Sequence, residues 1–202
     1  MGVKQGREDR SETKLALYLI LSIIPAGLAG YFGETWIESQ VRSSTIIALG
    51  LIGWGIVLYL ADQYHRRLVA TGAPLTDIDH LSAKQVAVVA LAQAIALIPG
   101  TSRSGITMTA GLFSKIEKTS AAELSFLMSV PIIAIAGAKK IVDLFSIGLG
   151  DLSLTALTTG FVAAAIAGFF AIWGLMKIIQ RWSFTPFVVY RITIGLLILW
   201  LL

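Results

Sequence analysis

Hydrophobic positions along this chain gather into long, nearly unbroken runs, not into the apolar–polar alternation of half-buried strands. Five of these runs are close to the roughly 20 residues that a helix needs to cross a bilayer, and polar connections separate them. The pattern therefore predicts an all-α integral membrane protein with five spanning helices. The predicted spans are residues 15–32, 43–61, 120–146, 152–176 and 184–202.

The chain begins with 14 polar and charged residues, which we interpret as a cytoplasmic tail. The 18-residue apolar run that follows is longer than the apolar part of a secretory signal peptide, which has roughly 7–15 residues. We therefore favour a first membrane span over a cleaved leader. Residues 15–202 are expected to form a single membrane domain.

One region breaks the pattern of full-length spans. Residues 86–98 form a 13-residue apolar run that is too short to cross a bilayer, and residues 105–113 form a second short run. Pro99, Gly100 and Gly105 interrupt the helix between them. Irregular backbone at membrane depth is tolerated only where protein or a wet cavity satisfies it. We predict a re-entrant hairpin of two half-helices over residues 82–114, with Ser82 as an N-cap and a polar tip near the midplane.

Lys and Arg residues indicate the orientation. They are concentrated in the N-terminal tail and in the polar segments 62–84, 115–118 and 177–181. The positive-inside rule then places the N-terminus in the cytoplasm and the C-terminus outside. Arg67 and Lys115 fall on the same side, so the hairpin is predicted to enter from the cytoplasm.

Composition supports the membrane assignment and excludes several kinds of chemistry. The mean hydropathy is +0.80, and 14% of residues are charged, against about a quarter in soluble domains. Without cysteine, the chain has no disulfides, thiolate metal ligands or cysteine nucleophile. The sequence has no stripe of basic residues of the kind that binds nucleic acid, which argues against a nucleic-acid-binding protein. His65 and His80 lie in the polar connection 62–84 and are predicted to be surface residues, not metal ligands.

The predicted tip has the chemistry of a phosphate-binding site. A helix beginning near Ser104 directs free N–H groups and a positive dipole into the break. Arg103 adds a planar fork suited to bidentate phosphate contact. An alternative is that proline and glycine only break the helix while Arg103 pairs with a buried carboxylate. A nucleotide P-loop is excluded because Ile106 replaces its lysine and no strand precedes it. The predicted catalytic residues are Arg103 and Ser102, and the predicted substrate contacts are Gly100, Thr101, Ser104, Gly105 and Thr107.

Residues 99–107, Pro-Gly-Thr-Ser-Arg-Ser-Gly-Ile-Thr, resemble the P-G-x-S-R-S-x-x-T signature of the undecaprenyl-diphosphate phosphatases, or bacitracin-resistance proteins. Residues 24–27, 121–131 and 184–191 are also similar to that family. The resemblance implies a bacterial plasma-membrane enzyme that hydrolyses undecaprenyl diphosphate to the monophosphate, which recycles the lipid carrier of cell-wall synthesis. It further implies an inverted-repeat fold, a prenyl diphosphate lipid as substrate, and a divalent cation, Mg²⁺ or Ca²⁺.

The sequence departs from this family in its first half. The family's [E/Q]-x-x-x-E motif, which runs into P-x-S-S-x-G-H, is absent, so we expect no first hairpin and find no metal ligands. Glu123, at the start of the third predicted span, is the nearest candidate for an acid–base group beyond the hairpin. Two hypotheses follow. The chain is a family phosphatase that is truncated or completed by a second copy or another polypeptide, or it is a non-enzymatic lipid-phosphate binder or transporter.

Overall fold

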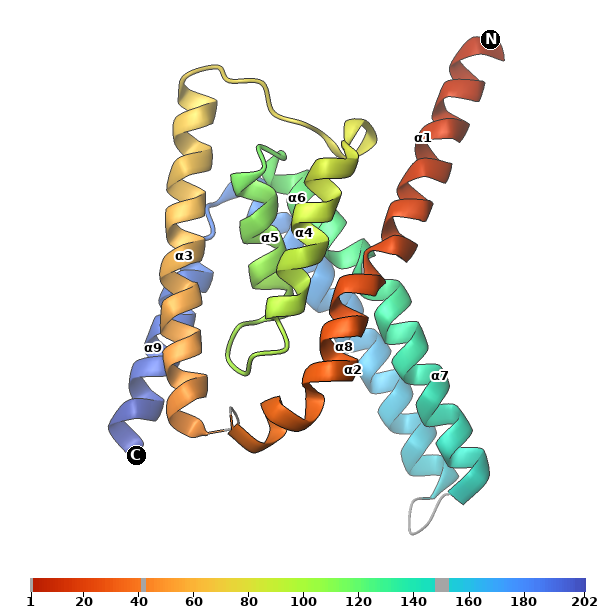
Figure 1. Cartoon of the computed structure of the whole chain (residues 1–202), viewed down its shortest axis with the longest axis vertical. Coiled ribbons are helices and arrows are strands. Elements are labelled where there is room, and N and C mark those ends of the chain that lie inside the picture. Colours follow the sequence, from red (N-terminus) through yellow and green to blue (C-terminus); the bar gives the residue numbers. More distant parts are fainter. Residues whose placement is uncertain (1, 41–42, 148–152) are drawn as a thin grey trace.

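The computed structural model describes residues 2–40, 43–147 and 153–202, with side chains described in 12–33, 43–146 and 153–202. Within these ranges the chain is helical and has no strand, only an isolated bridge between Thr76 and Ile116. This confirms the all-α prediction (Figure 1). The elements are α1 (Gly2–Leu21), α2 (Ile23–Gln40), α3 (Ser44–Ala70), η1 (Ile78–His80), α4 (Ala83–Ile95), α5 (Arg103–Phe113), α6 (Lys118–Leu127), α7 (Ser129–Ile147), α8 (Leu154–Arg181) and α9 (Thr185–Leu201).

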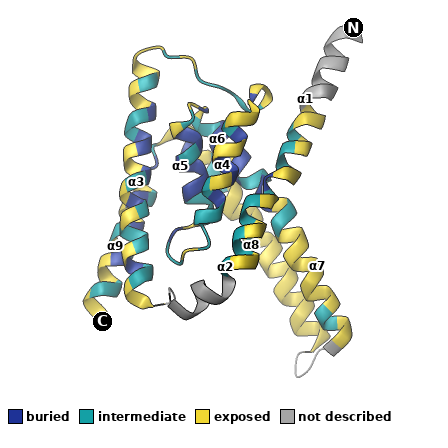
Figure 2. Ribbon diagram, in the orientation of Figure 1, coloured by how far each residue is buried: buried dark blue, intermediate teal, exposed yellow. Residues whose placement is uncertain are grey.

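Four helical stretches are long and apolar enough to cross a membrane: Glu12–Gly33, Ser44–Ala70, Lys118–Ser146 and Leu154–Arg181. They contain or overlap the first four predicted spans. The fifth prediction coincides with α9, whose 17 residues extend about 26 Å at 1.5 Å per residue. The large exposed side chains of α7 and α8 are hydrophobic along most of both helices, as expected for faces that contact lipid (Figure 2).

The predicted end of the second span, at residue 61, is wrong for the helix, because α3 continues for nine more residues to Ala70. Hydropathy marks where apolar side chains stop, whereas a helix can continue into polar sequence. Leu58, Ala61, Asp62 and His65 recur at helical spacing and form one buried face. The prediction of a surface His65 is therefore also wrong, since this side chain is buried against the neighbouring helices, while His80 is exposed as expected.

The third predicted span consists of two helices. α6 ends at Leu127 and α7 begins at Ser129, whereas we expected a kink at Pro131. Pro131 falls in the first turn of α7, where its missing N–H costs no helical hydrogen bond, so the break precedes the proline. The Ser129 hydroxyl donates to the carbonyl of Phe126 at this break.

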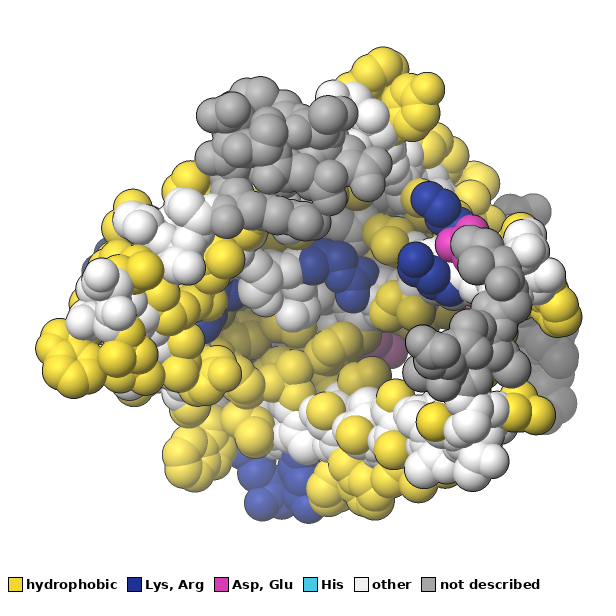
Figure 3. All heavy atoms as spheres, turned by 90° about the horizontal axis from the view of Figure 1, so that it is seen from below, with side chains coloured by type: hydrophobic (Ala, Val, Ile, Leu, Met, Phe, Trp, Pro, Cys, Tyr) yellow, Lys and Arg dark blue, Asp and Glu magenta, His cyan; other side chains and the backbone are white. Residues whose placement is uncertain are grey.

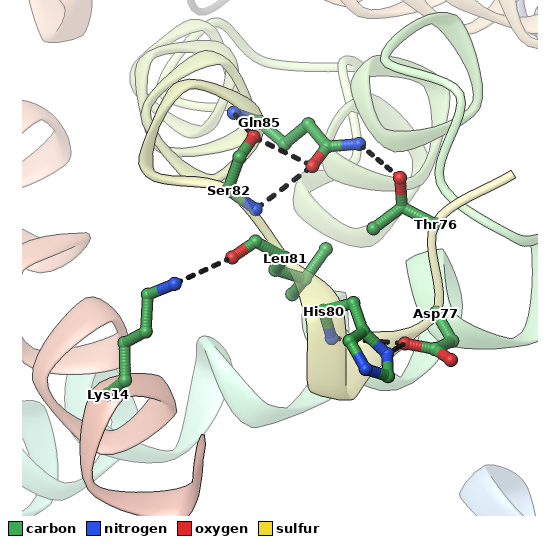
Figure 4. Close-up of polar contacts among 7 residues, drawn as sticks. All are labelled: Lys14, Thr76, Asp77, His80, Leu81, Ser82 and Gln85. Carbon is green, nitrogen blue, oxygen red and sulfur yellow. Dashed lines mark hydrogen bonds and ion pairs between the residues drawn. The ribbon is translucent and has the colours of Figure 1, made fainter. Parts of the chain in front are cut away.

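The hairpin consists of α4 and α5, and hydrogen bonds of Gln85 at its base bring its two ends together; Figure 4 shows the Gln85 end of these contacts. Ser82 caps α4 in a capping box with Gln85, as predicted. The Gln85 amide also donates to the Thr76 hydroxyl and to the Ser114 carbonyl, at 3.0 Å each. At 13 and 11 residues, the arms measure about 20 and 16 Å, short of a hydrocarbon core of about 30 Å. The chain thus turns back within the membrane.

Local contacts hold the segment that leads into the hairpin (Figure 4). Asp77 caps η1 and makes a 2.6 Å hydrogen bond with the His80 imidazole, which keeps the pKa of Asp77 below its usual value. Lys14 Nζ of α1 donates to the Leu81 carbonyl at 3.4 Å. The first span and the hairpin base are therefore connected at one end of the molecule.

Candidate functional site

The tip of the hairpin, residues 96–102, packs closely against the apolar half of α3. Gly100 has φ +85°, and a Cβ there would lie 2.3 Å from the Ile47 carbonyl oxygen. A Cβ on Gly50 would lie 2.8 Å from the carbonyl oxygen of Pro99. Contacts this short exclude any side chain. The glycines of the motif and of α3 therefore set how closely the tip approaches the helix.

Arg191 of α9, which sequence reasoning did not assign to the site, binds the tip from the other side. Its Nη2 donates to the carbonyls of Gly100 and Thr101 at 2.8 and 2.9 Å, and its Nε lies 3.5 Å from the Leu51 carbonyl. The side chain is only 7% exposed. These bonds satisfy carbonyls that leave the regular helix at the tip. An arginine inside an apolar span was the available signal for a functional role.

Ser102 occupies a backbone conformation that is unusual for a residue with a side chain, at φ 64° and ψ 113°. Such a conformation costs of order 1–3 kcal/mol and persists only where its surroundings enforce it. Here the Ser102 side chain accepts from the Gly105 N–H at 3.3 Å as the N-cap of α5, while Arg191 holds the preceding carbonyls. The residue remains exposed, so its hydroxyl is accessible.

Arg103 is the first residue of α5, one position earlier than predicted for the helix start. Its Nη1 is buried without a hydrogen-bond partner, and so is the hydroxyl of Thr101 beside it. Among the described residues no carboxylate pairs with Arg103, so the buried-carboxylate alternative is not what this structure contains. The tip thus presents an unsatisfied cation at a helix N-terminus.

A 230 Å³ pocket opens beside the tip, between α3, α5, α8 and α9. Ser102, Ser104, Gly105 and Arg191 form its polar part. Its remaining lining is largely apolar: Leu51, Leu58, Met108, Leu175, Phe184, Phe187 and Tyr190. Arg103 is not among the lining residues, so Arg191 is the arginine that faces this pocket. From below, the molecule is hollowed near its centre, with Lys or Arg side chains visible among hydrophobic ones (Figure 3).

Thr107, a predicted substrate contact, is buried and faces α6. Its hydroxyl lies 2.7 Å from the Ser125 hydroxyl and 2.9 Å from the Arg103 carbonyl oxygen. A Cβ on Gly111 would lie 2.8 Å from the Ala121 Cβ, so α5 and α6 pack closely here. Thr107 therefore supports the half-helix in this structure and does not line the pocket beside the tip.

Acidic side chains and histidines do not reach the tip pocket within the described residues. Glu123 is exposed on α6, and no Asp, Glu or His lines the pocket. Nor does the described part of the chain contain a group of three or more metal-ligating side chains. The described side chains that line the pocket beside the tip do not fit a divalent cation, because such ions require several oxygen ligands.

Comparison with known proteins extends over nearly the whole chain. The family model "Bacitracin resistance protein BacA" matches residues 1–197. Undecaprenyl-diphosphatase 2 of Stutzerimonas stutzeri (strain A1501) is 42% identical over 193 residues, which is 96% of this chain and 70% of the relative. The undecaprenyl-diphosphatase of Hahella chejuensis (strain KCTC 2396) is 39% identical over 94% of this chain and 68% of its own length. That of Elusimicrobium minutum (strain Pei191) is 42% identical, with 98% and 72% covered.

Proposed function

The chain belongs to the bacitracin resistance protein BacA family, and we propose that its part in that family's reaction is to bind the diphosphate of a prenyl lipid at the tip between α4 and α5. The activity is that of an undecaprenyl-diphosphatase, which hydrolyses undecaprenyl diphosphate to the monophosphate. The protein is a multi-pass membrane protein, so this lipid reaches the tip from within the bilayer.

The observation that carries this proposal is the buried, unpartnered Nη1 of Arg103. A buried donor without a partner costs about 1–3 kcal/mol, and more when it is charged. A diphosphate oxygen would remove this cost with a charge-assisted hydrogen bond. The Thr101 hydroxyl and the N–H groups at the start of α5, which lack helical partners, are further donors within the same few residues.

The pocket beside the tip suits the part of the substrate where phosphate meets hydrocarbon. Its polar side has two hydroxyls and the Arg191 guanidinium, while its other walls are aliphatic and aromatic. A prenyl diphosphate has the same division between an anionic head and an apolar chain. We assign the first isoprene unit to this pocket, with Ser102 and Ser104 facing the ester oxygen.

Catalysis needs groups that the tip itself does not provide. An isolated serine is a weak nucleophile because it requires a general base. The pocket offers Ser102 and Ser104 but no carboxylate or imidazole among its lining residues. We propose that the acid–base groups come from a second copy of this chain or from another polypeptide segment. The same observation favours a second candidate function, a lipid-phosphate binder or transporter that uses the tip without hydrolysis.

A binding measurement tests the tip directly. The detergent-purified chain is titrated with farnesyl diphosphate, and the Arg103→Ala and Arg103→Lys variants are compared with the original sequence. Loss of a charge-assisted contact should weaken binding roughly tenfold to a hundredfold, from about 1.5–3 kcal/mol. Lysine should not restore it, because an ammonium lacks the planar fork of guanidinium.

The matched control is Arg67→Ala, which removes an exposed arginine at the end of α3. Its affinity should equal that of the original chain. Equal affinity of the Arg103→Ala variant and the original chain would rule out the proposed role of the tip. Hydrolysis is scored separately as phosphate release by the chain together with a completing polypeptide segment; turnover there supports the phosphatase, and its absence supports the non-enzymatic binder.

A further inference from the structure

A second polar pocket, of 370 Å³, lies where the basic ends of three helical segments meet. It shares no lining residue with the pocket beside the tip. On α3 it begins at Asp62, four residues beyond Leu58 of the pocket beside the tip, which corresponds to about 6 Å along the helix. Its lining residues are Asp62, His65, Arg66, Val69, Lys118, Arg181, Trp182 and Ser183.

Positive charge exceeds negative charge in this pocket. Arg66, Lys118 and Arg181 contribute three cations, and Asp62 contributes one carboxylate, which leaves a net charge of +2 with His65 neutral. Asp62 is already paired with the Arg66 Nε at 3.1 Å. Glu117 is exposed nearby but does not line the pocket. Like charges held together are unfavourable unless an anion joins them.

Several donors in the pocket have capacity for a ligand. Lys118 donates one hydrogen bond, 2.8 Å to the Trp182 carbonyl, and an ammonium has three N–H groups. Lys118 also begins α6, whose N-cap Glu117 makes no side-chain capping bond, so the positive end of this ten-residue helix lies at the pocket. Independently, the Nε2 of His65 is buried without a partner in a side chain that is 6% exposed and lines the cavity, and it can donate to an anion when the ring carries a proton on this nitrogen.

We propose that this pocket binds a phosphate group, either the headgroup of an anionic phospholipid or free inorganic phosphate. A metal ion does not fit, because Asp62 and His65 stand among three cations and the described residues contain no third ligand for them. Trp182 is 66% exposed at the edge of the pocket, as is typical of aromatic residues at the membrane–water interface. The site therefore lies at the depth of lipid headgroups.

The experiment uses the full chain carrying Arg103→Ala, which removes the cation that the proposed function assigns to phosphate at the hairpin tip. Arg181→Gln removes one pocket cation, and Lys118→Gln removes another. Arg67→Gln is the control, since Arg67 is an exposed arginine on α3 that does not line the pocket. Equilibrium dialysis with radiolabelled orthophosphate measures free phosphate. Native mass spectrometry after purification with phosphatidylglycerol, or with uncharged diacylglycerol, measures retained lipid.

We expect one of the two phosphate probes to bind, and Arg181→Gln and Lys118→Gln each to weaken binding by roughly tenfold, as for one charge-assisted contact. Arg67→Gln should leave it unchanged, and diacylglycerol should not be retained. Which probe responds identifies the source of the phosphate. The proposal is overturned if neither phosphate probe binds, or if Arg67→Gln weakens binding as much as the pocket variants do. Because the pocket variants and the Arg67→Gln control are compared in the same Arg103→Ala background, the outcome is distinguishable from a failure of the function proposed for the tip.

Discussion

Replacing Arg191 by methionine should release the hairpin tip from α9. Methionine keeps an unbranched apolar stem but has no donor, so the carbonyls of Gly100 and Thr101 lose their 2.8 and 2.9 Å hydrogen bonds. Hydrogen bonds to charged groups contribute about 1.5–3 kcal/mol each, so the pair amounts to about 3–6 kcal/mol. The third contact, to the Leu51 carbonyl at 3.5 Å, is long and should add little.

The assay combines stability with a local reporter of the tip. For a protein of this size, a loss of 3–6 kcal/mol should lower the melting temperature in detergent by on the order of 10 °C. Because the chain has no cysteine, Ser102→Cys provides a single labelling site at the exposed tip residue. In the Arg191→Met background, maleimide should label this cysteine faster, since the tip is no longer held in one conformation.

Arg67→Met is the control for this prediction, because it removes an exposed arginine that does not contact the tip. It should leave both the melting temperature and the labelling rate unchanged. Arg191→Lys should fall between the two, because the lysine Nζ keeps the charge but ends about one bond short of the Nη2 atom that bonds both carbonyls. If Arg191→Met behaves like Arg67→Met in both measurements, the hydrogen bonds of Arg191 do not position the tip.

Three further predictions concern packing, topology and catalysis. Gly100→Ala should lower the melting temperature strongly, because its Cβ would collide with the Ile47 carbonyl oxygen. Gly53→Ala should leave the melting temperature unchanged or raise it, because no atom lies within 4 Å of a Cβ there. Cysteines that replace Arg67 and Glu117 should react with an impermeant maleimide on one side of the membrane, and a cysteine that replaces Ser146 should react on the other side. Reaction of the cysteines at 67 and 117 on opposite sides would refute the hairpin. The 202-residue chain, assayed as a monomer, should release little phosphate from a prenyl diphosphate with or without Mg²⁺ or Ca²⁺, and turnover by the monomer would contradict the need for acid–base groups from a second copy or another polypeptide segment.

Much of the architecture could be predicted because bilayer partitioning and helix capping are local properties of sequence. Apolar runs of known length identify the spans, and the short run of residues 86–98 before Pro99 identifies a segment that cannot cross. The Ser82 N-cap depends on Gln85, three residues later, so it is also local. The same reasoning identified Arg103 as a phosphate-binding candidate, since a charge within apolar sequence requires a reason.

The end of α3 could not be predicted in this way, because it depends on neighbours that are distant in sequence. Asp62 and His65 are polar, and hydropathy alone assigns them to a loop. In the structure they continue the buried face of α3. Similarly, the alternative that Arg103 pairs with a carboxylate could be decided only once the surroundings of its guanidinium were known.

The sequence by itself determined the membrane class, the interrupted hairpin and the residues from which a phosphate site is made, because each depends on short stretches of chain. Tertiary structure alone decided which of those residues act together. Arg191 reaches carbonyls 90 and 91 positions earlier, and Thr107 turns to Ser125 on the next helix. No local pattern encodes these contacts. They arise because Gly50 and Gly100 allow α3 and the tip to approach closely enough for an arginine on α9 to bind both.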